Sequence, residues 1–135
     1  MSGRFLTFLI LLFAAPSLPA FEDDFLMPDE AFKPTVTPDG NTITASWKIA
    51  EGYYLYKEKF GFESQTPGVT LGEPEFPPAE MHHGIKPNGE EGDVEVYFEE
   101  VAVQIPVTSG SGVADIRVRY QGCAEKGLCY PPQKK

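Results

Sequence analysis

The sequence has 135 residues, a length that suits one domain built around a single hydrophobic core. Hydrophobic residues make up 41% of the chain, which is enough for such a core and argues against a disordered protein. The formal net charge of −9 disfavours binding to nucleic acid or to an anionic membrane surface, because both carry negative charge themselves.

The first twenty residues have the layout of a secretory signal peptide. A short start that contains Arg4 precedes an apolar run over residues 5–15, and a small-residue tail ends at Ala20. The apolar run is shorter than the roughly 20 residues that span a bilayer. We therefore expect export to the periplasm, cleavage after Ala20 and a mature domain of residues 21–135. Export also places the cysteines in an oxidising compartment.

The first part of the mature chain predicts a lead-in followed by a strand. Residues 21–31 are acidic and irregular, and we expect them to pack Phe25 or Phe32 against the body of the domain. After a strong turn signal at residues 37–41, every second residue from Ile43 to Ile49 is apolar and the residues between are polar. This period of two is typical of a strand with one buried face.

The following segments continue the β pattern. Further strands are expected at residues 53–60, 94–98, 101–105 and 116–120, with a bulge at residues 99–100. Residues 72–92 are rich in proline, glycine and charge, and we expect a long surface loop there. The prediction is an all-β, immunoglobulin-like β-sandwich whose core contains Ile43, Trp47, Val103, Ile116 and Val118.

The cysteine pair, Cys123 and Cys129, is expected on a β-hairpin. The strand at residues 116–120 runs into Cys123, residues 124–128 form the tip, and Cys129 starts the return. Facing residues of an antiparallel hairpin lie about 4.5–5.5 Å apart at Cα, which overlaps the range of a disulfide. The pair can therefore be bonded or reduced with little movement of the backbone.

Two functions are compatible with this hairpin. A bond that closes so short a loop contributes roughly 2 to 2.5 kcal/mol, near the low end for disulfides. Gly122 and Gly127 let another backbone approach, and Pro131-Pro132 interrupts the return strand beside the pair. The residues alone leave open whether the pair exchanges with a partner or staples a non-catalytic exported binding module.

Tyrosines lie around the pair in the sequence. Tyr54 and Tyr56 share one face of their predicted strand, and Tyr120 and Tyr130 flank the two cysteines. All four are candidates for shielding the disulfide from small thiols and for binding a protein partner. The alternative is the ordinary packing of half-buried tyrosines in strands.

Two motifs make the chain resemble a known family. They are Gly-Tyr-Tyr-Leu-Tyr-Lys at residues 52–57 and Tyr-Gln-Gly-Cys through Cys-Tyr-Pro-Pro at residues 120–132. Together with residues 28–32, Trp47, residues 94–97 and residues 105–107, they resemble the N-terminal periplasmic domain of the thiol:disulfide interchange protein DsbD. The resemblance extends over nearly all of residues 25–133.

The resemblance implies an immunoglobulin-like redox domain with both cysteines on one hairpin. It implies that Cys129 forms the mixed disulfide with a partner and that Cys123 resolves it. The implied partners have the thioredoxin fold: a thioredoxin-like donor domain, periplasmic disulfide isomerases and thioredoxin-like proteins of cytochrome c maturation. A membrane is involved only through a downstream domain, if the sequence is a fragment of a longer protein and not a stand-alone relative. No cofactor is implied.

The chain departs from the family in the loop that covers the cysteines. The family has an aromatic residue just before a glycine there, whereas the matching residues 88–92 contain none. Glu90 and Glu91 are the candidate partner-binding residues of this loop, and His82, His83 or Ile85 are candidates to cover the pair instead. The two histidines could also join the cysteines in a metal site, but five residues between cysteines are more than the usual two to four, and we expect no metal.

Overall fold

The computed structural model describes residue 3, residues 25–110 and residues 115–135. The predicted signal peptide and its cleavage site therefore lie outside the described residues, Gly3 apart. Among the described residues, no helix has the length and apolar character that crossing a membrane requires.

The described chain is almost entirely β-structure. One helical turn, α1 (Pro28–Ala31), and one 3₁₀ turn, η2 (Lys57–Lys59), accompany the strands. The strands are β1 (Phe32–Asp39), β2 (Thr42–Ile49), β3 (Tyr53–Tyr56), β4 (Gly61–Ser64), β5 (Thr70–Leu71), β6 (Glu80–Ile85), β7 (Glu91–Tyr97), β8 (Glu100–Ser109), β9 (Ile116–Tyr120), β10 (Gly122–Ala124) and β11 (Gln133–Lys134).

Two sheets enclose the main core. One has the order β1-β2-β8-β5 and the other β11-β9-β4, and all of their pairings are antiparallel. Trp47 of β2 reaches from the first sheet to the second, where its ring lies 5.6 Å from that of Tyr120 and 6.1 Å from that of Phe62. Burial of these large side chains removes apolar surface from water and holds the two sheets face to face.

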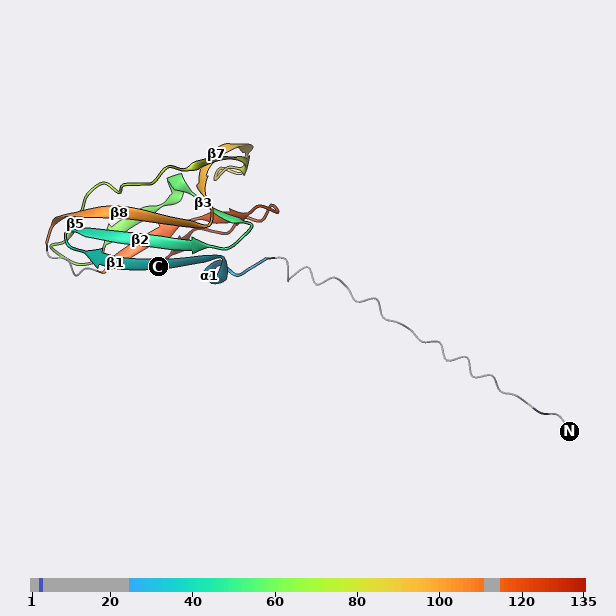
Figure 1. The fold of residues 1–135 in the computed structure, drawn as a ribbon, viewed down its shortest axis with the longest axis horizontal. Helices are drawn as coiled ribbons and strands as arrows, with labels where there is room; N and C mark the ends of the chain where they lie inside the picture. The colour runs from blue at the N-terminus through green and yellow to red at the C-terminus, as the bar shows by residue number, and fades with distance from the viewer. Residues whose placement is uncertain (1–2, 4–24, 111–114) are drawn as a thin grey trace.

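A third sheet, β10-β3-β7-β6, forms one end of the molecule. In Figure 1 the β6–β7 hairpin rises above the sandwich at the end where the red C-terminal hairpin projects. All four residues of β3 are buried, because both of its faces are covered. Tyr53 and Leu55 pack into the main core, whereas Tyr54 and Tyr56 pack with Cys123 in a second cluster. The strand alternation therefore separates the fold's core from the cysteine site.

The predicted fold is confirmed: the chain is an all-β sandwich with the cysteine pair on a hairpin. Four of the five predicted core residues, Ile43, Trp47, Val103 and Val118, are buried, and Ile116 is partly buried against them. Of the two lead-in phenylalanines, Phe32 is fully buried whereas Phe25 stays 36% exposed.

Three predicted segments are corrected. Residues 80–85 and 91–92 are not loop but strand, because β6 pairs with β7 along its whole length. Residues 53–60 are not one strand: the chain leaves the β3 sheet through η2 and enters another sheet as β4. The phase change at residues 99–100 is a change of sheet between β7 and β8 rather than a bulge, and Glu99 takes a φ of 61° at this crossing.

Candidate redox site

The two cysteines form a disulfide on a tight hairpin. Cys123 lies in the middle of β10, which pairs with β3, and it faces Cys129 across an antiparallel bridge with a Cα–Cα separation of 4.0 Å. The Ala124 N–H donates to the Leu128 carbonyl at 2.7 Å and closes the loop. Gly127 turns the chain with a φ of 111°, a conformation that favours glycine. The backbone thus holds both sulfurs in bonding range.

The close packing of β10 on β3 requires Gly122. A Cβ atom at this position would lie 2.2 Å from the Tyr54 carbonyl oxygen and 2.7 Å from Cζ of Phe32. The return strand is held to the same residue, since the Tyr130 N–H donates to the Gly122 carbonyl at 3.0 Å. The absence of a side chain at residue 122 is therefore what seats the cysteine hairpin against the domain.

The two sulfur-bearing residues differ in access. Cys123 is fully buried, whereas Cys129 is only partly buried and stands next to Leu128, which is 38% exposed. A thiolate that attacks a disulfide approaches along the axis of the bond and needs an open side. Cys129 is therefore the more accessible of the two cysteines.

Two tyrosines of β3 pack against the disulfide. Tyr54 and Tyr56 lie edge to face with ring centroids 5.6 Å apart, and both are buried in the cluster with Cys123. The Tyr56 hydroxyl oxygen is 2.9 Å from Sγ of Cys123 and 3.6 Å from Sγ of Cys129. The same hydroxyl donates a hydrogen bond to the backbone carbonyl of Ile85 in β6. Tyr56 therefore joins the disulfide to the neighbouring hairpin.

Both hydroxyls stay protonated at physiological pH. Burial raises the pKa of Tyr54 and of Tyr56 above the ordinary value of a phenol, because the phenolate would lose its hydration. Neither tyrosine is thus a base, and Tyr56 is a neutral hydrogen-bond donor beside the sulfurs.

His82 of β6 packs against one of these tyrosines, Tyr54, and against Phe98. Its ring centroid lies 4.7 Å from that of Tyr54 and 5.6 Å from that of Phe98. Gly84, two residues along the same strand, makes room for the imidazole: a Cβ atom there would lie 2.8 Å from Nε2 of His82 and 3.6 Å from the Tyr54 hydroxyl. An aromatic ring of β6 therefore packs on the cluster around Cys123, and it stands on the strand and not in the loop at residues 88–92.

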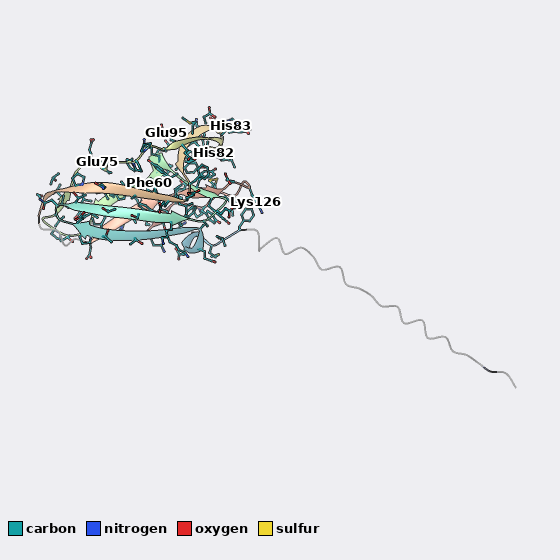
Figure 2. All side chains as sticks on the ribbon, in the orientation of Figure 1. Phe60, Glu75, His82, His83, Glu95 and Lys126 are labelled. Atoms are coloured by element: carbon teal, nitrogen blue, oxygen red, sulfur yellow. A yellow bond between two sulfur atoms is a disulfide. The ribbon has the colours of Figure 1, made fainter. Side chains whose placement is uncertain are left out.

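His83 points to the other side of the hairpin. Its Nδ1 lies 3.0 Å from a carboxylate oxygen of Asp93, and its Nε2 lies 3.6 Å from one of Glu91. The hydrogen bond with Asp93 raises the pKa of His83 above its ordinary value. Figure 2 shows His83 toward the outer side of the β6–β7 hairpin, His82 nearer the body and Lys126 at the tip of the cysteine hairpin. The adjacent histidines thus have different surroundings.

Glu90 and Glu91 lie exposed at the turn of the β6–β7 hairpin. The Glu90 carbonyl accepts from the Lys86 N–H at 2.7 Å, and the Glu90 N–H donates to the side chain of Asn88 at 2.9 Å. Both side chains are exposed, and that of Glu91 also lies near His83 on the outer side of the hairpin.

Tyr120 and Tyr130 lie in the main core and not beside the sulfurs. The Tyr120 ring contacts that of Trp47, and the Tyr130 ring stacks on that of Tyr53. The Tyr130 hydroxyl donates a hydrogen bond to the Leu26 carbonyl. The chain changes sheets between β9 and β10, so neighbours of the cysteines in sequence need not be neighbours of their side chains. Their adjacency in the sequence predicts that these two tyrosines shield the disulfide. The structure does not bring them to it.

Val94, Val96 and Phe98 are site residues for which the sequence predicted only a strand. Both valines are buried in the cluster with Cys123, and Phe98 packs against it. Their period-two spacing predicts a buried face of the strand. It does not predict whether that face packs in the main core or in the cluster with Cys123. Among the described residues, no three histidine, cysteine or acidic side chains group closely enough to hold a metal ion.

Comparisons with known proteins point to one family. The family model described as thiol:disulfide interchange protein DsbD, N-terminal, matches residues 22–135. The chain is 36% identical to thiol:disulfide interchange protein DsbD 1 of Pseudomonas aeruginosa over 98% of its length and 24% of that protein. It is 38% identical to DsbD of Pseudoalteromonas atlantica over 86% of its length and 19% of that protein. The chain thus spans a quarter or less of these relatives.

Two solved structures are similar over most of both chains. The DsbD N-terminal domain of Neisseria meningitidis in the reduced form superposes with a TM-score of 0.71, at 32% identity over 83% of this chain and 86% of that one. The complex between the DsbD N-terminal and the PilB N-terminal domains from the same organism gives a TM-score of 0.64, at 31% identity over 83% of this chain and 84% of that one.

Proposed function

Because the chain belongs to the family of N-terminal domains of the thiol:disulfide interchange protein DsbD, we propose that it carries out thiol–disulfide exchange through Cys123 and Cys129. In the proposed reaction a thioredoxin-like donor reduces the pair, and the resulting dithiol reduces a second thioredoxin-fold protein. Periplasmic disulfide isomerases and thioredoxin-like proteins of cytochrome c maturation are the proposed acceptors.

The unequal access of the two sulfurs is the observation that carries this proposal. Cys129 is partly exposed, whereas Cys123 is fully buried, and the two residues face each other at a Cα–Cα distance of 4.0 Å. A partner can therefore form a mixed disulfide with one residue and be released by the other without movement of the hairpin. A structural staple has no need of such an asymmetry.

The cover over the disulfide supports selectivity for proteins over small thiols. Tyr54 and Tyr56 pack with Cys123 on the buried side of the bond, and His82 of β6 packs on Tyr54. Glu90 and Glu91 at the exposed hairpin turn are positioned to contact a partner that lifts this cover. Support for a thioredoxin-like partner comes from the relative that forms a complex with the PilB N-terminal domain.

We place the reaction in the periplasm, with residues 1–20 as the signal peptide and residues 21–135 as the exported domain. The hydrophobic run of residues 5–15 supports export, and an oxidising compartment supports the formation of the disulfide. The proposed exchange between this domain and its partner proteins then takes place outside the cytosol.

Trapping tests the assignment of the two cysteines. Cys123→Ala leaves a thiol at residue 129 that attacks an oxidised thioredoxin-fold partner and has no neighbour to resolve the mixed disulfide. We expect this variant to accumulate the mixed disulfide on a non-reducing gel and Cys129→Ala not to. Equal trapping by both variants would show that the roles are wrong. If neither variant traps such a partner, the proposed exchange fails.

The competing function is a binding module with a structural disulfide. The reduction potential separates the two, because structural bonds of secreted proteins typically lie below about −300 mV. We expect a potential above that range, measured by equilibration with thioredoxin or glutathione. A potential well below it would favour the structural bond.

A further inference from the structure

We propose that Tyr56 is a catalytic residue of this domain: its hydroxyl donates a hydrogen bond to the sulfur of Cys123 when that sulfur leaves the disulfide. The inference deepens the proposed exchange function and rests on it for its role in the cell. It assigns to Tyr56 a part in breaking the bond, beyond shielding it.

The geometry offers the hydroxyl two acceptors. Its oxygen lies 2.9 Å from Sγ of Cys123 and also donates to the Ile85 carbonyl. A sulfur in a disulfide carries no hydrogen, so Tyr56 is the donor in any hydrogen bond between them. Cys129 is farther away, at 3.6 Å, so the hydroxyl favours the buried sulfur over the accessible one.

The reaction creates negative charge on that buried sulfur. The donor thiolate attacks Sγ of Cys129, the new S–S bond joins donor and Cys129, and the electron pair of the old bond leaves on Cys123 as a thiolate. A second donor thiol then displaces Cys129, so that the donor ends as a disulfide and this domain gains two electrons as a dithiol. Only the first step leaves an anion in the closed cluster around Cys123.

A buried thiolate needs a hydrogen-bond donor. Cys123 is fully buried among Tyr54, Val94 and Val96, where the apolar side chains cannot hydrate an anion. A hydrogen bond to an ionised acceptor is about twice as strong as one to a neutral acceptor, so the Tyr56 proton is expected to turn from the Ile85 carbonyl to the sulfur. Because burial raises its pKa, Tyr56 keeps that proton.

The first measurement is the pKa of the Cys123 thiol in a chain with no other cysteine. We compare Cys129→Ala with Cys129→Ala/Tyr56→Phe by the ultraviolet absorbance of the thiolate as a function of pH. Loss of the donor should raise the thiol pKa by about one unit, which is a tenfold loss of thiolate at a given lower pH. An unchanged pKa would overturn the proposal.

Tyr97→Phe in the same background is the matched control. Tyr97 is also a buried tyrosine whose hydroxyl donates to a backbone carbonyl, that of Pro77 at 2.8 Å, but it packs in the main core. Tyr97→Phe should leave the pKa of the Cys123 thiol unchanged. An equal shift in both variants would mean that the effect is a general result of removing a buried hydroxyl, and the assignment to Tyr56 would be wrong.

The second measurement is the rate at which dithiothreitol reduces the oxidised chain. Tyr56→Phe should slow this reaction roughly tenfold, because the leaving sulfur loses its donor. A hydroxyl that merely fastens β6 over the site would have the opposite effect, and faster reduction would therefore refute the proposal. Neither measurement uses a partner protein. Failure to trap a partner would therefore refute the proposed function without changing what these two measurements show about Tyr56.

Discussion

Replacing His82 by alanine should open the disulfide to small thiols. The imidazole contacts the rings of Tyr54 and Phe98 at 4.7 and 5.6 Å and holds β6 over the site. Each contact between rings contributes roughly 0.5–1.5 kcal/mol beyond the area it buries. We take about 1.4 kcal/mol for the two contacts together. The free energy needed to lift the edge strand β6 then falls by that amount in the variant. Reduction through the opened state should then be about tenfold faster.

The assay is the reduction of the oxidised chain by excess glutathione, followed by alkylation of the free thiols and separation on a gel. His83→Ala is the matched control, because that neighbour faces Asp93 and Glu91 on the outside of the hairpin. It should change the rate by less than twofold.

His82→Phe should restore slow reduction, because a ring returns to the same place. The reduction potential should be the same in all three variants, since a cover slows reduction and oxidation equally. A His82→Ala rate equal to that of the unmodified chain, or an equal gain in His83→Ala, would refute the shielding role.

Two further predictions concern Gly122, where β10 packs on β3, and His83 in β6. Gly122→Ala should cost about 2–3 kcal/mol in urea unfolding, because its Cβ would meet the backbone oxygen of Tyr54 at 2.2 Å, and a loss below about 0.5 kcal/mol would contradict this. His83 should titrate by NMR above its ordinary pKa of about 6.5, and Asp93→Asn should lower that pKa. Because the folded-state pKa is raised, the charged His83 stabilises the hairpin fully below about pH 6.5, and this contribution is lost as the pH rises through the folded pKa. A His83 pKa that stays raised without Asp93 would show that another group causes the shift.

The local sequence determined the strands with one buried face and the position of the cysteine hairpin. Period-two alternation in residues 43–49 placed Trp47 in the core, because successive side chains of a strand point to opposite faces. The short spacing of Cys123 and Cys129, with Gly127 at the tip, was enough to predict a hairpin that a disulfide can bridge. Both results depend on residues close together in the chain.

Strand β6 could not be predicted in the same way. Its residues lack alternation, and His82, His83 and Gly84 resemble a polar loop. They form a strand because β7 supplies the backbone partners along their whole length. His82, whose ring packs on Tyr54, was therefore one of several candidates for a cover until the pairing was known.

The tertiary structure alone decided which tyrosines meet the sulfurs. Alternation tells which face of its own strand a side chain occupies, but not which sheet that strand joins. Tyr54 and Tyr56 reach Cys123 because β3 lies between β10 and β7, with one face toward each cluster. Tyr120 and Tyr130, although next to the hairpin in sequence, pack in the main core because the chain changes sheets between β9 and β10. Such changes of sheet depend on contacts between distant segments, which the local pattern of residues does not contain.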